Sequence, residues 1–335
     1  KCISCDKCVA VCAAIQQCHV LDGNKRPAKG SFADSGCVYC GNCLSVCPTG
    51  AMVENDQPEK GRELEMRQTS TICPYCGVGC SITMHTMDNR VIKVSSPHSS
   101  LNDGWLCVNG RFGFYFVNSE ERLKAPMIMK GGVLVEVGWE EAMNLVASKL
   151  LGIRKEHGGR AIAGFASAKC TNEENYLFQK FMRCAIGSNN VDHCARLCHA
   201  PTVVGLAKAF GSGAMTNTIE ELEHADCIFI VGSNTTETQP VTALRIKKAK
   251  SRGAKIIVAD PRRTELAELA DVHLQLSHGS DTALINAIMA IILAEGWEDR
   301  EFIEQRTENF QDLERLLRDF DVEEAERITR SEAHT

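Results

Sequence analysis

Closely spaced cysteines near the start of the chain limit its fold more than any other feature. The sequence contains 18 cysteines, and 13 of them precede residue 108. Disulfide scaffolds with so many cysteines belong to short secreted chains that have only a small core. Here residues 108–335 have the mixed composition of an ordinary α/β protein, and most of the earlier cysteines stand in tight runs. We therefore predict metal ligation in a reducing compartment rather than a disulfide framework.

The first 57 residues contain two runs with the spacing C-x2-C-x2-C-x3-C, and Pro48 follows the second run. This spacing is typical of bacterial ferredoxins with two 4Fe–4S clusters, in which the fourth cysteine of each run binds the other cluster. A pair of zinc sites does not account for it. We predict a ferredoxin-like domain over residues 1–57, with one cluster on Cys2, Cys5, Cys8 and Cys47 and a second on Cys12, Cys37, Cys40 and Cys43. Cys18 lies outside both runs and is predicted to be a spare thiol.

A third group of cysteines follows a polar linker at residues 58–67. It consists of Cys73, Cys76, Cys80 and, after 26 intervening residues, Cys107. Residues 81–94 alternate apolar and polar side chains around a polar turn, which predicts a β-hairpin. The hairpin would return Cys107 to the other three cysteines, so residues 68–127 are predicted to form a small domain with a third 4Fe–4S cluster. On spacing alone, zinc remains an alternative here.

Strand and helix patterns alternate through residues 128–335. We predict strands at 133–137, 161–166, 226–234 and 255–260, and helices at 139–157, 172–186, from 201 onward, 241–251 and 283–294. Such an alternation implies a parallel sheet covered on both faces, and ligands of such sheets bind at the carboxyl ends of the strands. The chain has no G-x-G-x-x-G motif, so NAD binding on this chain is not expected.

Small and polar residues follow the predicted strands in this region. Carboxylates and amides suit ribose and guanine edges, whereas arginine and backbone N–H groups suit pyrophosphate. The alternative is that these residues serve only in turns and helix caps. The candidate nucleotide contacts are Gly232, Asn234, Glu237, Asp260, Arg262, Gly279 and Asp281.

Composition excludes some partners. With 24% charged residues and a formal net charge of −6, the chain gives no electrostatic reason to expect nucleic-acid binding. No apolar run reaches the length of a membrane span, since the longest candidate, residues 283–294, is interrupted by Asn286. A cluster motif is already under way at Cys2, so we expect the natural N-terminus to be missing.

The third cysteine group carries a specific resemblance. Residues 72–80 (I-C-P-Y-C-G-V-G-C) and 106–113 (L-C-V-N-G-R-F-G) resemble the N-terminal iron–sulfur domain of molybdenum or tungsten bis-pyranopterin oxidoreductases. The resemblance implies an α+β ferredoxin-like iron–sulfur domain followed by α/β layers of the formate dehydrogenase/DMSO reductase-type fold. It also implies a molybdenum (or tungsten) bis-molybdopterin guanine dinucleotide, contacted by the strand-end residues and by Asn172 and Glu173. Because members of that family run further, the resemblance implies that the chain is also truncated at its C-terminus. Asn109 stands where the family usually has a lysine between the cluster and the pterin.

Residues 191–201 (V-D-H-C-A-R-L-C-H-A-P) are similar to the segment of this family that supplies the protein ligand of the metal. Cysteine followed by histidine resembles the formate dehydrogenase form. It implies that Cys198 is the metal ligand and that His199 accepts the proton of formate, as a group that titrates near neutral pH is able to do. Arg196 is predicted to be structural. Packing roles are predicted for Cys170, Cys184, Cys194 and Cys227.

The resemblance implies the catalytic subunit of a cytoplasmic formate dehydrogenase. It would oxidise formate to CO2, or run the reverse reaction, and pass electrons through three 4Fe–4S clusters to a flavin-bearing NAD-reducing iron–sulfur subunit or a hydrogenase. One alternative is another molybdopterin oxidoreductase such as a nitrate reductase. The other is a complex I-like electron-relay subunit without an active site. The chain as given is expected to be inactive alone.

Overall fold

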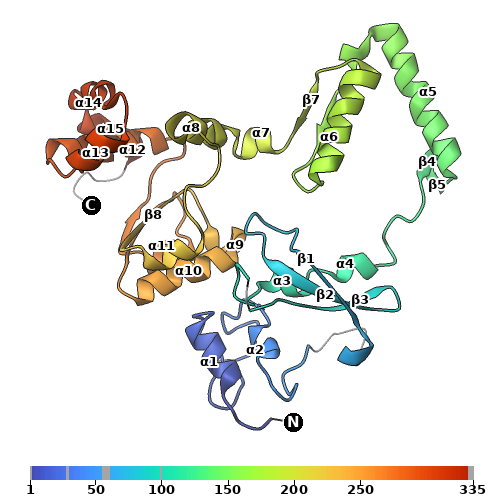
Figure 1. Ribbon diagram of the computed structural model, residues 1–335, viewed down its shortest axis with the longest axis horizontal. Coiled ribbons are helices and arrows are strands. Elements are labelled where there is room, and N and C mark those ends of the chain that lie inside the picture. The colour runs from blue at the N-terminus through green and yellow to red at the C-terminus, as the bar shows by residue number, and fades with distance from the viewer. Residues whose placement is uncertain (1, 28–29, 55–60, 99, 331–335) are drawn as a thin grey trace. The chain divides into compact units, whose positions relative to one another are not determined.

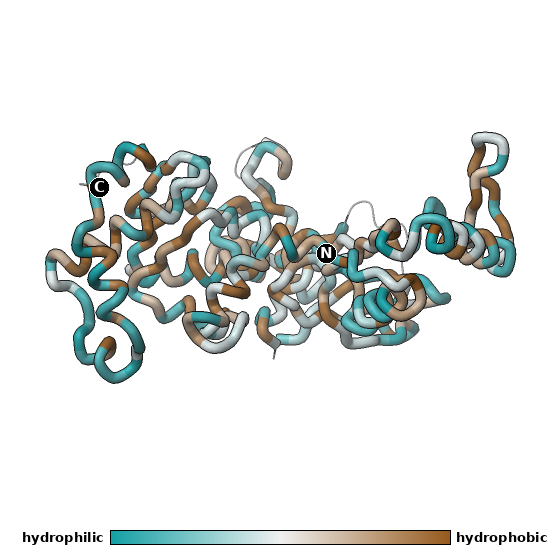
Figure 2. The backbone as a smooth tube through the Cα atoms, turned by 90° about the horizontal axis from the view of Figure 1, so that it is seen from above, coloured by the Kyte–Doolittle hydropathy of each residue, from teal (hydrophilic) through white to brown (hydrophobic). Residues whose placement is uncertain are grey.

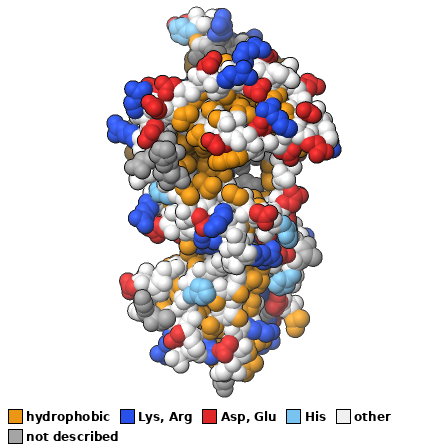
Figure 3. Space-filling view, turned by 90° about the vertical axis from the view of Figure 1, so that its left-hand side faces the viewer, with side chains coloured by type: hydrophobic (Ala, Val, Ile, Leu, Met, Phe, Trp, Pro, Cys, Tyr) orange, Lys and Arg blue, Asp and Glu red, His pale blue; other side chains and the backbone are white. Residues whose placement is uncertain are grey.

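The computed structural model describes residues 2–27, 30–54, 61–98 and 100–330. The chain divides into two compact units, which are described separately: residues 1–114 together with 218–335, and residues 115–217. Within the described residues, no helix is both long enough and apolar enough to cross a membrane. Hydrophobic side chains reach the surface in several places, with charged groups around them (Figure 3).

The N-terminal part of the first unit consists of two short helices and long connecting loops. Helices α1 (Lys7–Ala14) and α2 (Asn42–Ser45) pack against each other. Each begins after a residue in the left-handed conformation, Asp6 and Gly41. The loops hold most of the cysteines, as expected of a cluster-binding domain. Residues 58–60 of the predicted linker lie outside the described residues, and its described part contains the 3-10 helix η1 (Glu63–Glu65).

A three-stranded antiparallel sheet carries the third cysteine group. The predicted hairpin is confirmed as β2 (Ser81–Met87) and β3 (Arg90–Ser95). The sequence prediction missed the third strand, β1 (Arg67–Ile72), which pairs antiparallel with β2. All six of its residues are exposed, so it lacks the alternation of apolar and polar side chains that marks a half-buried strand. The helix α3 (Val108–Phe112) follows, with Cys107 at its N-cap.

The α/β part of the first unit contains three parallel strands in the order β10-β9-β8. They are β8 (Cys227–Val231), β9 (Lys255–Ala259) and β10 (Val272–Leu274). Helices α10 (Pro240–Ser251) and α11 (Glu265–Leu269) lie alongside them (Figure 1) and share their apolar core. The short helices η4 (Glu220–His224) and α9 (Thr235–Thr238) flank β8. The prediction of β8 as a buried strand was wrong for one face: Cys227 is exposed and Phe229 is 43% exposed, whereas Ile228 and Ile230 on the other face are buried.

Four helices complete this unit: α12 (Asp281–Ala294), α13 (Arg300–Arg306), α14 (Phe310–Arg318) and α15 (Val322–Thr329). Helix α12 packs against α14 and α15. The sequence predicts α12 as a buried helix, but only one face is buried, through Leu284, Ala287 and Ala290. Those three residues recur at helical spacing, so α12 covers the core as an ordinary amphipathic helix would.

Strands and helices also alternate in the second unit, but its strands form separate sheets. In chain order it contains α4 (Tyr115–Asn118), β4 (Met127–Lys130), β5 (Val133–Glu136), α5 (Trp139–His157), η2 (Gly159–Ala161), β6 (Gly164–Ala166), α6 (Asn172–Lys180), the π-helix η3 (Phe181–Ile186), β7 (Val191–His193), α7 (Ala195–Cys198) and α8 (Ala200–Phe210). Strands β4 and β5 form an antiparallel hairpin, seen in Figure 2 as two mostly brown arms. Strands β6 and β7 pair in parallel with each other. The strand predicted at 133–137 is β5, which pairs antiparallel with β4, so the prediction of a parallel sheet is wrong for this strand.

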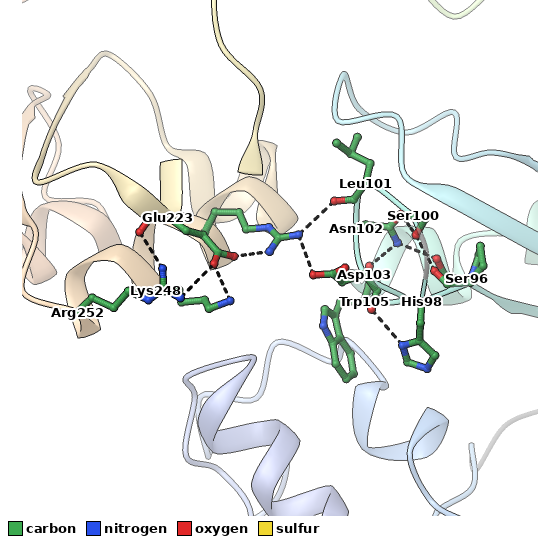
Figure 4. Close-up of polar contacts among 12 residues, drawn as sticks. Ser96, His98, Ser100, Leu101, Asn102, Asp103, Trp105, Glu223, Lys248 and Arg252 are labelled. Atoms are coloured by element: carbon green, nitrogen blue, oxygen red, sulfur yellow. Dashed lines mark hydrogen bonds and ion pairs between the residues drawn. The ribbon is translucent and has the colours of Figure 1, made fainter. Parts of the chain in front are cut away.

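Ion pairs attach the α/β part of the first unit to the loop before Cys107 (Figure 4). Arg245, on α10, donates to the Leu101 carbonyl oxygen (3.2 Å) and to the Asp103 carboxylate (3.2 Å). Its guanidinium also pairs with Glu223, a carboxylate that is only 7% exposed. Val241, on the same helix, packs into the core that contains Cys73 and Cys80. Helix α10 therefore holds the third cysteine group in place.

Candidate metal and cofactor sites

The first cluster site, Cys2, Cys5, Cys8 and Cys47, lies at the N-terminal end of the first unit. All four cysteines line one cavity of about 120 Å³. Cys2 and Cys5 are exposed, whereas Cys8 is buried. Hydrogen bonds from the backbone N–H groups of Met52, Thr49 and Ala51 lower the pKa of Cys47 to about 7. A thiol that loses its proton this readily is well suited to bind iron as a thiolate.

The second cluster site, Cys12, Cys37, Cys40 and Cys43, lines another cavity, which Cys18 also lines. Burial raises the pKa of Cys40 and of Cys43 to about 11. The Cys12 thiol also contributes to the raised pKa of Cys37 and of Cys43. The fourth cysteine of the first run therefore lies close to the second run. A cluster bound here would replace buried thiol protons, so its assembly would release protons.

The third cluster site, Cys73, Cys76, Cys80 and Cys107, lies between the small sheet and α3. The Cys73 N–H donates to the Cys80 carbonyl oxygen at 2.9 Å, which closes the loop between them. Burial and the neighbouring thiols Cys73, Cys76 and Cys107 together raise the pKa of Cys80 to about 12. In the described part of the chain, no three His, Cys, Asp or Glu side chains converge to hold a single metal ion. Each of the three sites nevertheless gathers four cysteines, the number of thiolates that a 4Fe–4S cluster takes.

Asn109 lies next to the third cluster site and lines a cavity of about 340 Å³. Cys107 and Cys40 line the same cavity, and so does Glu237, one of the predicted nucleotide contacts. The sequence reasoning missed Lys247, whose side chain is 7% exposed and lines this cavity beside Glu265, with 2.5 Å between the ammonium and the carboxylate. Helix α10 also contains Lys248 and Lys250, so the sequence does not single out Lys247 as the buried lysine.

The structure places the six other predicted nucleotide contacts of this region after the parallel strands of the first unit. Gly232 follows β8, with its N–H donating to the Ala259 carbonyl oxygen (2.9 Å). Asp260 follows β9, is 4% exposed, and accepts a hydrogen bond from the N–H of Arg262 (2.8 Å). Because parallel strands end at one edge of a sheet, these segments lie at a common edge. Asn234 follows β8 as well, and Gly279 and Asp281 follow β10.

The remaining predicted contacts, Asn172 and Glu173, begin α6 in the second unit. Both are exposed. Thr171 caps this helix: its hydroxyl accepts from the N–H of Glu174 at 3.2 Å, and the Glu174 carboxylate accepts from the N–H of Thr171 at 2.7 Å. This reciprocal capping box fixes where the helix begins.

Cys198 and His199 lie at the junction of α7 and α8, and both are exposed. His199 is the N-cap of α8, and Pro201 occupies the first turn, where a missing N–H costs nothing. Arg196, on α7, pairs with Asp192, on β7, at 2.8 Å.

The predicted packing roles of four cysteines are wrong, since Cys170, Cys184, Cys194 and Cys227 are all exposed. Cysteine is usually a buried residue, and that tendency misled the prediction.

Three family models match consecutive parts of the chain: a 4Fe-4S dicluster domain at residues 1–51, the molybdopterin oxidoreductase Fe4S4 domain at 66–119, and molybdopterin oxidoreductase at 122–315. Among solved structures, acetylene hydratase from Pelobacter acetylenicus is similar, with a TM-score of 0.62 and 22% identity over 79% of this chain and 37% of that one. At this identity the likeness concerns the fold alone.

Curated relatives are closer in sequence. The F420-dependent formate dehydrogenase subunit alpha of Methanocaldococcus jannaschii is 46% identical over 79% of this chain and 39% of its own length. Formate dehydrogenase H of Escherichia coli K12 is 41% identical over 79% of this chain and 38% of its own. A Bacillus subtilis protein named Probable oxidoreductase YjgC is 36% identical over 98% of this chain and 38% of its own. The chain thus spans about two fifths of the length of these relatives.

Proposed function

This chain belongs to the molybdopterin oxidoreductase family, and we propose that the complete protein oxidises formate to CO2. The observation that carries the proposal is the Cys198–His199 pair, exposed at the start of α8. The similarity to proteins named formate dehydrogenase supports it. Oxidation of formate releases CO2, one proton and two electrons, so the site needs a proton acceptor and an electron acceptor.

We propose that Cys198 holds the molybdenum or tungsten ion and that His199 takes the proton. A thiolate is a soft anionic ligand, suited to a metal that also carries dithiolene sulfurs. A ring nitrogen of the His199 imidazole can accept a proton, so this side chain can serve as the base. When bound, the metal would accept the two electrons.

The cofactor would be a bis-molybdopterin guanine dinucleotide. We propose that the 340 Å³ cavity lined by Asn109, Glu237 and Lys247 holds a pterin beside the third cluster site. Its lysine supplies a buried positive charge at a place where Asn109 offers only an amide. The nucleotide ends would lie along the carboxyl edge of β8–β10, near Gly232 and Asp260.

Electrons would leave through the three clusters. Cys107 and Cys40 line one cavity, so the third cluster would pass electrons to the second, which shares its ferredoxin-like domain with the first. The exposed Cys2 and Cys5 make the first cluster the exit toward a partner. We expect a flavin-bearing NAD-reducing iron–sulfur subunit or a hydrogenase as that partner.

The test is viologen reduction by formate with the complete protein, loaded with molybdenum or tungsten. His199→Gln should lower the rate by at least about 100-fold, the scale of a lost acid–base group. Cys198→Ser should also lower the rate, because it removes the proposed thiolate ligand of the metal. His199→Gln should keep its full metal content. Cys194→Ser, four residues earlier and also exposed, is the matched control and should keep the wild-type rate. A wild-type rate in His199→Gln would refute the assigned proton transfer.

Asn109 favours a second candidate, an electron-relay subunit that keeps the fold without catalysis. This candidate predicts that the fully loaded complete protein transfers electrons from dithionite to its partner but does not reduce viologen with formate. Another catalytic branch, such as a nitrate reductase, predicts oxidation of reduced viologen by nitrate instead. The same assay with each substrate separates the three.

A further inference from the structure

We propose that Arg111 is a positioning residue that fixes the spacing and the reduction potentials of the second and third cluster sites. The proposal rests on the electron relay proposed above. It assigns control of the spacing and the potentials within that relay to a residue that binds no iron. Arg111 is on α3, one helical turn after Cys107, and its side chain crosses to the ferredoxin-like domain.

The contacts of Arg111 join a ligand of one cluster site to a ligand of the other. Its Nε donates to the carbonyl oxygen of Cys40 at 2.8 Å. Its backbone N–H donates to the carbonyl oxygen of Cys107 at 3.0 Å. One residue therefore provides a hydrogen-bonded path from Cys107 to Cys40, which would connect the third cluster to the second.

Asn42 completes this hydrogen-bonded network, called here the joint between the second and third cluster sites. Arg111 Nη2 donates to Asn42 Oδ1 at 3.0 Å, and the N–H of Leu106 donates to the same oxygen at 3.4 Å. The Asn42 amide donates in turn to Gln16 Oε1 at 3.4 Å. Asn42 is 1% and Arg111 6% exposed, so these groups are held together away from water, where such networks are rigid.

Gly41 permits the close approach. A Cβ on Gly41 would lie 2.4 Å from Arg111 Cδ and 2.6 Å from Phe112 Cζ. The residue also has φ +67°, a conformation that glycine adopts without strain. The backbone next to Cys40 is therefore shaped to receive the arginine.

The charge of Arg111 acts on both cluster sites. Burial lowers its pKa, while the thiols of Cys40, Cys43 and Cys107 oppose that shift. The guanidinium stays protonated, because arginine does not lose its proton in proteins. A cluster with four thiolates gains negative charge on reduction, so a buried cation between two clusters favours the reduced form of each and raises its potential.

The experiment is a dithionite titration of the complete protein followed by electron paramagnetic resonance, with iron analysis alongside. Arg111→Gln removes the positive charge of the guanidinium and its forked pair of N–H donors to Cys40 and Asn42. We expect this variant to keep its full iron content. In both clusters the one-electron equilibrium should shift at least tenfold toward the oxidised form, which lowers the reduction potential by 59 mV. The magnetic coupling between the two clusters should weaken. Arg111→Lys keeps the charge and should hold the potentials within threefold while the coupling still weakens. Arg315→Gln, on the exposed face of α14, is the matched control and should change nothing.

Unchanged potentials in an iron-replete Arg111→Gln protein would overturn the electrostatic role. If Arg111→Gln loses iron, Arg111→Lys tests the positioning role instead. Magnetic coupling of wild-type strength between the clusters of Arg111→Lys would overturn that role. Dithionite replaces formate as the reductant, so these outcomes do not depend on whether the protein oxidises formate.

Discussion

Replacing Glu223 by glutamine tests whether the ion pairs around α10 hold the first unit together. The Glu223 carboxylate is 7% exposed and pairs with Arg245, with Lys248 at 2.6 Å and with Arg252 at 3.8 Å. Arg245 is itself only 11% exposed. Glu223→Gln leaves this buried guanidinium without its nearest anion, although Asp103 remains 3.2 Å away.

Removing one partner of a buried pair costs about 3–5 kcal/mol. Because Asp103 still compensates part of the charge on Arg245, we expect about 3 kcal/mol for Glu223→Gln. In a domain of this size each kcal/mol lowers the melting temperature by about 2–4 °C, so the loss should be about 6–12 °C. Anaerobic thermal scans at one fixed rate would measure it.

Glu324→Gln is the matched control for this measurement. Glu324 pairs with Arg327 at 2.6 Å, but both side chains are at least half exposed. Exposed pairs contribute little, so we expect a shift below about 2 °C. An equally small shift for Glu223→Gln would refute the reasoning. The double variant with Arg245→Gln should lose less than the two single variants added together, because the two residues share one interaction.

The effect should depend on pH in a definite direction. Burial raises the pKa of Glu223, but hydrogen bonds from Lys248 and Arg245 outweigh burial and lower it overall. A carboxyl with a lowered pKa stabilises the fold above its unfolded pKa of about 4.3, and loses that contribution as the pH falls through the folded value. The gap between wild type and Glu223→Gln should stay constant from about pH 8 to about pH 5.5 and begin to close near pH 4.

Three further predictions concern the cluster domains and the second unit. Gly41→Ala should destabilise the joint with Arg111 by roughly 2–4 kcal/mol through backbone strain and overlap, measured as a lower melting temperature with Gly36→Ala, a left-handed glycine in open space, as control. Cys12→Ser should remove one four-iron cluster by iron analysis, whereas Cys18→Ser should keep all iron; equal iron content in both would contradict the assignment. Thr171→Ala should cost about 1 kcal/mol by removing a helix cap, seen as faster proteolysis of the second unit.

Local pattern predicted much of this chain. The β2–β3 hairpin and α5 follow from alternation and helical periodicity, and both are confirmed. Strand β1 was not predicted, because its six residues are all exposed and show no alternation of apolar and polar side chains. The prediction of a parallel sheet failed for β5, because periodicity identifies a strand but not its neighbour: β5 pairs antiparallel with β4.

The sequence by itself determined where the candidate iron–sulfur ligands stand, because cysteines that wrap one cluster are a few residues apart and that spacing is local. It also supplied the Cys198–His199 pair as a candidate site. Only the tertiary structure decided which groups lie between the clusters. Arg111 meets Cys40 and Asn42 across 71 and 69 residues of chain. Such contacts depend on how two backbones approach at Gly41, and no periodicity along the chain encodes that approach.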